Sequence, residues 1–242
     1  MEFNEFEIKD KLPELDNPHA IAVLRPYLDA KDIGTSIFNT LLKEANCKEL
    51  GQLKEPGKFY DFTRYRPQTY SEDEKRRLDL PNTTIYYSQQ KEDQDFLFLN
   101  LLEPHSYGEQ YVELITDLLK KMDIERYLLL GSFYDTVPHT KPLIVSGNGP
   151  QTLFAREGIE IQKSNYEGSS SIVFNININL SETDTEAIYL LVSIPQYLQY
   201  MKMNQGFIPG KVRLMKILNK LYDIPVLSKD KEIAREQLEK IG

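Results

Sequence analysis

The segment from Asp95 to Leu130 constrains the fold most, because it has the pattern of a strand, a helix and a second strand. A nearly continuous apolar run covers Asp95 to Leu102, as is typical of a strand buried on both faces. Apolar residues then recur with helical spacing from Tyr111 to Met122, and a second apolar run covers Arg126 to Leu130. Two strands joined in this way lie parallel through a right-handed crossover, so we expect an α/β sheet with helices on its faces.

Local signals predict where the elements of this unit begin and end. Ser106 is followed three residues later by Glu109, a capping-box pattern that predicts a helix start. Gly131 directly follows the second apolar run, so it is expected at the carboxyl end of that strand.

The rest of the chain alternates short apolar runs with amphipathic stretches. Further strands are predicted at His19 to Tyr27, Lys48 to Leu53, Tyr60 to Tyr65, Thr83 to Ser88 and Ala187 to Ile194. Further helices are predicted at Ile33 to Ala45, around Leu214 to Leu221, and from about Lys229 to Ile241. The segment 171–180 fits both a strand, by alternation of apolar residues with Asn, and a helix, by the row Ile172, Ile176 and Leu180.

Together these elements predict an α/β fold with a mixed, largely parallel sheet flanked by helices. We expect the α/β domain to span residues 1–222. The charged helix in residues 223–242 is expected to pack on this domain or to extend from it.

Charge and cysteine content argue against several classes of protein. The net charge is −8 and no basic stripe is present, so a nucleic-acid partner is not expected. The single cysteine, Cys47, excludes a disulfide within the chain and a cysteine-rich zinc centre. We expect neither a metal nor a cofactor, and the alternative is a metal site assembled in three dimensions from Glu103, Asp135 and His139. The acidic start of the chain and the shortness of its longest apolar run predict no membrane segment and a cytoplasmic location.

Polar residues follow three of the predicted strands. Glu103 follows the first, Asp135 and His139 follow the second, and Tyr197 follows the strand ending at Ile194. Ligands of open α/β sheets bind beyond the carboxyl ends of the strands, so these side chains would form one pocket if the strands are neighbours.

Asp135 and His139 allow two interpretations. A carboxylate that orients an imidazole can perform acid–base chemistry. Alternatively, Asp135 caps a turn, Pro138 fixes the loop and His139 is hydrogen-bonded to the backbone, or the loop forms a subunit contact, and we favour this second interpretation.

Arg64 and Arg66 form a second candidate cluster. On the predicted strand from Tyr60 to Tyr65 and beyond, both arginines would share one face and could clamp a carboxylate or phosphate. We favour instead ion pairs with Asp61 or Glu103, or a subunit contact. The chain has no G-x-S-x-G, G-x-x-x-x-G-K-[ST] or G-x-G-x-x-G motif, so whether it is an enzyme stays open, with a non-catalytic role favoured.

Four blocks, in this order and spacing, resemble those of the PAC2 (proteasome-assembly-chaperone-like) family. They are Tyr60-Asp61-Phe62-Thr63-Arg64-Tyr65-Arg66-Pro67, Glu103-Pro104, Tyr134-Asp135-Thr136-Val137-Pro138-His139-Thr140-Lys141-Pro142 and Ile194-Pro195-Gln196-Tyr197-Leu198. The resemblance runs from about Ile21 to Tyr222. In the last block Gln196 replaces the family's usual histidine.

The resemblance implies a phosphorylase/hydrolase-like three-layer sandwich and favours a helix at 171–180. It also implies a homo-oligomer that binds other proteins as an assembly or chaperone-like factor. The alternative is a nucleoside- or phosphate-type small-molecule binding protein or enzyme. The candidate pocket or interface residues are Arg64, Arg66, Glu103, Asp135, His139, Thr140 and Tyr197.

Overall fold

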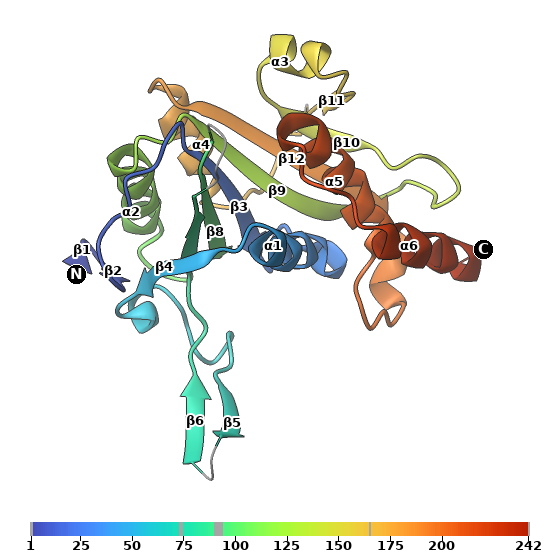
Figure 1. Cartoon of the computed structure of the whole chain (residues 1–242). Helices are drawn as coiled ribbons and strands as arrows, with labels where there is room; N and C mark the ends of the chain where they lie inside the picture. The colour runs from blue at the N-terminus through green and yellow to red at the C-terminus, as the bar shows by residue number, and fades with distance from the viewer. Residues whose placement is uncertain (1, 73–74, 90–93, 165, 242) are drawn as a thin grey trace.

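The computed structural model describes residues 2–72, 75–89, 94–164 and 166–241 (Figure 1). Among these residues a ten-stranded sheet has the order β1-β2-β4-β7-β8-β3-β9-β12-β10-β11. In that order the strands are Glu2–Phe3, Phe6–Ile8, Lys48–Leu53, Thr84–Ser88, Phe96–Leu102, His19–Arg25, Arg126–Asp135, Glu186–Pro195, Val145–Asn148 and Gln162–Lys163. The central strands β8, β3, β9 and β12 are parallel, whereas β1, β2, β4 and β7 on one side pair antiparallel.

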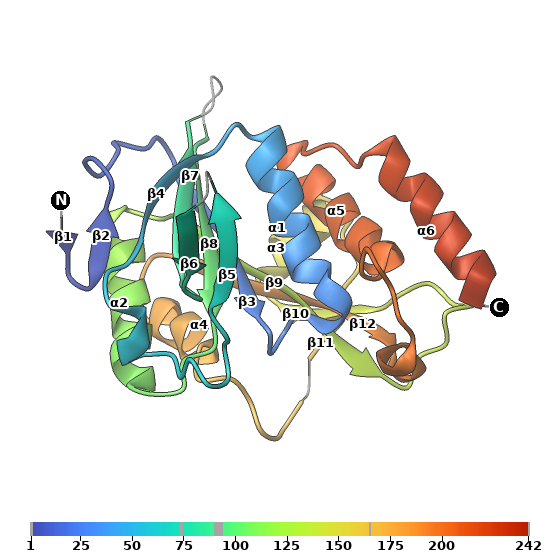
Figure 2. The same cartoon turned by 90° about the horizontal axis from the view of Figure 1, so that it is seen from below.

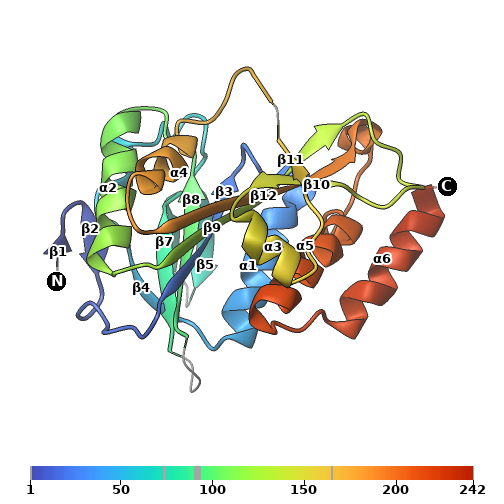
Figure 3. The same ribbon diagram turned by 90° about the horizontal axis from the view of Figure 1, so that it is seen from above.

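Helices cover both faces of this sheet, as Figures 2 and 3 show. One face carries α1 (Ile33–Glu44), α3 (Gln151–Arg156) and α5 (Ile208–Tyr222), which share a buried apolar cluster with the sheet. The opposite face carries α2 (Gly108–Lys121) and α4 (Phe174–Ser181), which build a second buried cluster. The predicted α/β class, with a mixed sheet between two helix layers, is confirmed.

The strands buried on both faces and the amphipathic helices lie where the sequence predicts them. Leu97, Leu99 and Leu101 of β8 point to the side of α2, while Phe96 and Phe98 point to the side of α1. Most of the ambiguous segment 171–180 is helical, because α4 covers Phe174–Ser181. The helix is therefore confirmed from Phe174 on, with Ile176 and Leu180 buried, whereas Ile172 lies before its start.

The predicted strand from Tyr60 to Tyr65 is wrong. After a short 3-10 helix at Pro56–Lys58 the chain turns, and the N–H groups of Arg64 and Tyr65 both donate to the carbonyl of Asp61. Tyr60 is buried and its hydroxyl is hydrogen-bonded to that of Thr83 at 2.6 Å. The alternation of aromatic and polar residues therefore reflects turn packing.

The predicted capping box is also wrong. Helix α2 begins after Tyr107, whose φ is 53° and whose side chain makes no capping hydrogen bond. The main-chain N–H groups of His105 and Ser106 donate to the carbonyl of Phe59 at 2.8 and 3.2 Å. These contacts from a distant turn fix how the chain enters the helix, and they override the local signal.

Strand β9 continues past Gly131 to Asp135, so the expectation that Gly131 ends this strand is wrong. The pairing with β12 extends to the last residue of each strand, because Tyr134 lies opposite Ile194 and Asp135 opposite Pro195. At Gly131 the turn after β3 crosses the strand closely, and the N–H of Ser132 donates to the carbonyl of Leu28 at 2.9 Å.

Gly131→Ala is expected to lower the free energy of unfolding by about 1–3 kcal/mol, because an overpacked core must shift its backbone. A Cβ at Gly131 would lie 2.6 Å from the carbonyl oxygen of Leu28. Urea unfolding measures the loss. Gly57→Ala is the control, since its Cβ would meet only the ring of Phe62 at 3.3 Å. Equal stability of the two variants would contradict the expectation.

A two-stranded hairpin projects from the body below the sheet, as Figure 1 shows. Its strands β5 (Gln68–Glu72) and β6 (Lys75–Asp79) pair antiparallel, and all of their residues are exposed. Arg77 pairs with Glu72 at 2.7 Å. We name this hairpin, residues 68–72 and 75–79, the arm.

Helix α6 (Ser228–Ile241) packs along α5. Ala234 contacts the buried Ile208 and Val212, and the Gln237 side chain accepts a hydrogen bond from the N–H of Ile208. The Nζ of Lys211 lies 2.6 Å from the Oδ2 of Asp230, with both side chains almost withdrawn from solvent. The charged helix therefore has apolar and ionic contacts to the body. Within the described ranges, no helix has the length and apolar content needed to cross a membrane.

Candidate functional site

The strand order divides the predicted pocket into two parts. Strands β9 and β12 are direct neighbours, so Asp135 and Tyr197 follow adjacent strand ends. Strand β8 is separated from β9 by β3. Because neighbouring strands lie about 4.8 Å apart, β8 lies about 10 Å from β9 across the sheet, and β9 also continues beyond the level at which β8 ends before Glu103.

His139 and Tyr197 do come together at the carboxyl edge. The main-chain N–H of His139 donates to the Tyr197 hydroxyl oxygen at 2.9 Å, and the ring Nδ1 lies 2.5 Å from the same oxygen. One hydroxyl can accept the main-chain hydrogen and donate its own to Nδ1, so the pair ties the loop after β9 to the 3-10 helix η3 (Gln196–Tyr200).

Asp135 has a different partner from His139. Its Oδ1 accepts the N–H of Thr136 at 2.7 Å and so holds the turn after β9. Thr140 lies in the exposed part of the loop. The geometry thus corresponds to a stiffened loop, in which the Asp135 carboxylate is bonded to main chain as predicted. The main-chain partner predicted for the His139 ring is wrong, because the ring is bonded to the Tyr197 hydroxyl.

Glu103 supports the start of the α4 segment. Its Oε2 accepts a hydrogen bond from the Ser171 hydroxyl, and the main-chain N–H of Ile172 also bonds its carboxylate. Burial raises the pKa of Glu103, while the hydrogen bonds from Ser171 and Ile172 oppose this rise. Its main-chain carbonyl accepts the Tyr65 hydroxyl at 3.0 Å. Glu103 therefore joins three segments of the chain.

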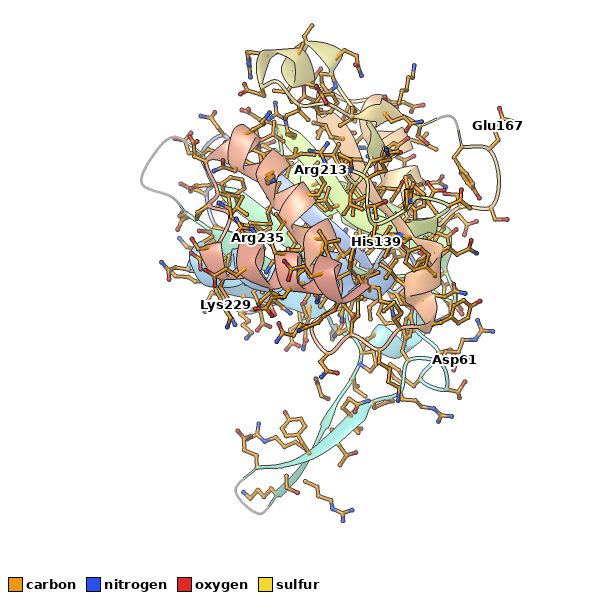
Figure 4. The ribbon with its side chains drawn as sticks, turned by 90° about the vertical axis from the view of Figure 1, so that its right-hand side faces the viewer. Asp61, His139, Glu167, Arg213, Lys229 and Arg235 are labelled. Carbon is orange, nitrogen blue, oxygen red and sulfur yellow. The ribbon has the colours of Figure 1, made fainter. Side chains whose placement is uncertain are left out.

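Arg64 and Arg66 do not form the fork that was the alternative to ion pairs, because the strand on which the fork depends is absent. Arg64 is exposed, and its Nε lies 3.7 Å from the Oδ2 of Asp61. Arg66 is exposed and lines a separate cavity at the base of the arm. Figure 4 shows Asp61 near the arm and His139 higher on the body, so the two candidate clusters are distinct.

An open pocket of about 510 Å³ lies beside the His139–Tyr197 pair, and the sequence analysis did not identify one of its exposed residues, Tyr200. It is lined by Asp135, Thr136, Val137, Pro138, Gln196, Tyr197 and Tyr200. Tyr200 has an exposed fraction of 82% and Tyr197 of 42%. We name these seven residues the tyrosine surface. The spacing of Tyr197 and Tyr200, one turn of a 3-10 helix, could have signalled that both rings share a side.

The opposite edge of the sheet holds a buried histidine. The Nδ1 of His19, in β3, lies 3.2 Å from the hydroxyl of Tyr222 at the end of α5. Arg126 pairs with Glu186 at the starts of the neighbouring strands β9 and β12. Burial lowers the pKa of His19 to about 4, and the positive charge of Arg126 adds to this effect.

In residues 2–72, 75–89, 94–164 and 166–241, no three His, Cys, Asp or Glu side chains are grouped so that they could hold a metal ion.

The mixed sheet, with parallel strands at its centre and helices on both faces, defines a three-layer α/β protein. The model of the PAC2 family matches residues 23–241. The chain belongs to the PAC2 family.

Solved structures with this fold include relatives from bacteria and archaea. A PAC2 family protein from Streptomyces avermitilis is 21% identical, with a TM-score of 0.80 over 93% of this chain and 94% of that one. A proteasome-assembly chaperone homologue from Mycobacterium tuberculosis is 18% identical, with a TM-score of 0.79 over 92% and 93% of the two chains. A Pyrococcus furiosus protein described as an archaeal proteasome activator is 12% identical, with a TM-score of 0.74 over 98% and 96%. A search of curated proteins found no match.

Proposed function

We propose that the chain is a protein-binding assembly factor of chaperone-like type that acts as a homo-oligomer in the cytoplasm. The observation that carries this proposal is the tyrosine surface, where the almost fully exposed Tyr200 lies beside an open pocket with Val137 and Pro138 in its wall. Tyrosine is enriched at protein interfaces and at their energetic hot spots.

The hydrogen bonds of this edge support the same role. His139 is bonded to Tyr197 and Asp135 to the main chain of Thr136, so both groups fix the shape of the loop. A loop held in one conformation loses little entropy when a partner binds it. This rigidity suits recognition of a protein surface.

The relatives indicate a first partner to test. Two structural neighbours are described as a proteasome-assembly chaperone homologue and as a proteasome activator. A large protein assembly in the native host, with the proteasome as the first candidate, is therefore the partner that we propose.

Tyr200→Ser is expected to reduce recovery of the partner at least tenfold when the tagged chain is purified from its native host, because loss of a hot-spot side chain costs about 2 kcal/mol or more. Quantitative mass spectrometry of the recovered proteins measures the loss. Tyr166→Ser is the matched control, since Tyr166 is 69% exposed but lies outside the tyrosine surface.

Two results would contradict the proposal. Recovery of the same partner in equal amounts with wild type and Tyr200→Ser would remove the tyrosine surface from the interaction. Light scattering that gives a monomer mass for the wild type at micromolar concentration would refute the homo-oligomer.

A further inference from the structure

A polar row crosses the sheet at the base of the arm. Arg25 ends β3, and its Nε donates to the Oδ1 of Asn100 in β8 at 2.8 Å. The Nδ2 of Asn100 in turn lies 3.4 Å from the Oγ1 of Thr84 in β7. Two residues earlier in β3 and β8, on the same face of the sheet, Val23 and Phe98 are apolar and buried. The change from apolar to polar marks the place where the sheet faces a cavity.

This cavity has a volume of about 710 Å³. Arg25, Thr84 and Asn100 line it from the sheet, Asp29 and Asp32 from the chain before α1, and Arg66 from the chain before the arm. Cavities of about 300–1,000 Å³ are typical of sites for small molecules. The site also lies beyond the carboxyl end of the parallel strand β3, where open α/β sheets commonly bind ligands.

The cations of the cavity are available to a ligand. Among the described residues, neither Arg25 nor Arg66 has an acidic side chain within ion-pair distance. Arg25 is half-buried, and its bond to Asn100 fixes the plane of the guanidinium. A fixed guanidinium presents paired N–H donors that match the oxygens of a carboxylate or phosphate.

The carboxylates of the wall divide into two kinds. Asp29 is buried and accepts hydrogen bonds from the N–H and hydroxyl of Thr35, and Glu49 pairs with Lys9 at 2.7 Å. Asp32 and Asp79 also line the cavity, and their oxygens can accept hydrogen bonds from a ligand. A ligand that suits both the arginines and these two carboxylates carries an oxyanion and, apart from it, hydroxyl or amino donors.

We propose that this cavity binds a small organic phosphate or carboxylate that carries hydroxyl or amino groups. Arg25 and Arg66 hold the oxyanion, and Asp32 and Asp79 accept the hydrogen bonds of the remaining part. The site is separate from the tyrosine surface and does not depend on the assembly role.

Isothermal titration of the full chain with inorganic phosphate, adenosine 5′-monophosphate and L-malate tests this site. At least one of the two organic probes is expected to bind with a submillimolar Kd. Arg25→Gln and Arg66→Gln are each expected to weaken that binding about tenfold or more, because each removes a charged hydrogen bond. Arg64→Gln is the matched control: Arg64 is an exposed arginine of the same turn that does not line the cavity.

Each contrary outcome overturns a stated part of the proposal. Absence of heat from both organic probes at about 10 mM rejects the site, since that concentration corresponds to only about 3 kcal/mol of binding. Equal weakening by Arg64→Gln would show a general charge effect, and unchanged binding in Arg66→Gln would reject the assigned cations. Inorganic phosphate binding as tightly as adenosine 5′-monophosphate would remove the role of Asp32 and Asp79. Because Arg66 is exposed, its variant tests the site even if Arg25→Gln fails to fold.

Discussion

Lys211→Met is expected to lower the free energy of unfolding by about 3–5 kcal/mol, because it leaves a buried carboxylate without its counter-ion. Lys211 in α5 has 6% of its side chain exposed and Asp230 in α6 has 12%. Methionine keeps most of the volume of the lysine stem but removes the charge. Urea unfolding measures the loss, and hydrogen exchange of residues 228–241 shows whether α6 detaches first.

The double variant Lys211→Met, Asp230→Leu separates charge from packing. Replacing both partners of a buried pair by apolar residues is often neutral or stabilising, so most of the lost stability should return. A double variant as unstable as Lys211→Met would contradict this explanation. It would show that the helix contact depends on the shape of the two side chains and not on their charge balance.

Acidification from pH 7.5 to 4.5 is expected to remove about 2.5 kcal/mol of stability through His19 alone. The folded-state pKa of His19 is about 4, below the ordinary value of 6.5, because the ring is buried and close to Arg126. Between pH 6.5 and 4, His19 is therefore protonated in the unfolded chain but neutral in the folded chain. The stability contribution is complete above pH 6.5 and is lost as the pH falls toward 4.

His19→Gln isolates this contribution from that of the carboxylates, which titrate in both proteins. Between pH 7.5 and 4.5 the wild type should lose about 2.5 kcal/mol more than the variant in urea unfolding. Parallel pH profiles of the two proteins would contradict the assignment. The exposed fraction of His19 is 8%, so solvent screening has little effect on this value.

The strands and helices that depend on one apolar pattern could be predicted from the sequence. Strand β8 and helix α2 are examples, since a strand buried on both faces has a continuous apolar run, whereas a helix buried on one face has apolar residues at helical spacing. Local patterns failed where a distant segment decides the conformation. The turn at Tyr60 is stabilised by Thr83, and the entry to α2 is held by the carbonyl of Phe59.

The candidate site shows the same limit. The contact between His139 and Tyr197 follows from the pairing of β9 with β12. The sequence predicts that these two residues come together if the strands before them are neighbours. The separation of Glu103 could not be anticipated, because strand order is not encoded in the pattern of any one strand. For the same reason the hydrogen bond between Arg25 and Asn100, which lie on the adjacent strands β3 and β8, could not be predicted from the sequence.

The arm has a consequence for how the chain can diverge. Its strand residues are all exposed, so the buried clusters place few demands on which side chains occupy them. Substitutions away from buried features usually change stability by no more than about 0.5 kcal/mol. The sequence of the arm can therefore change during evolution while the sheet and the helices stay constrained. New contacts to other molecules can arise on the arm without a change of fold.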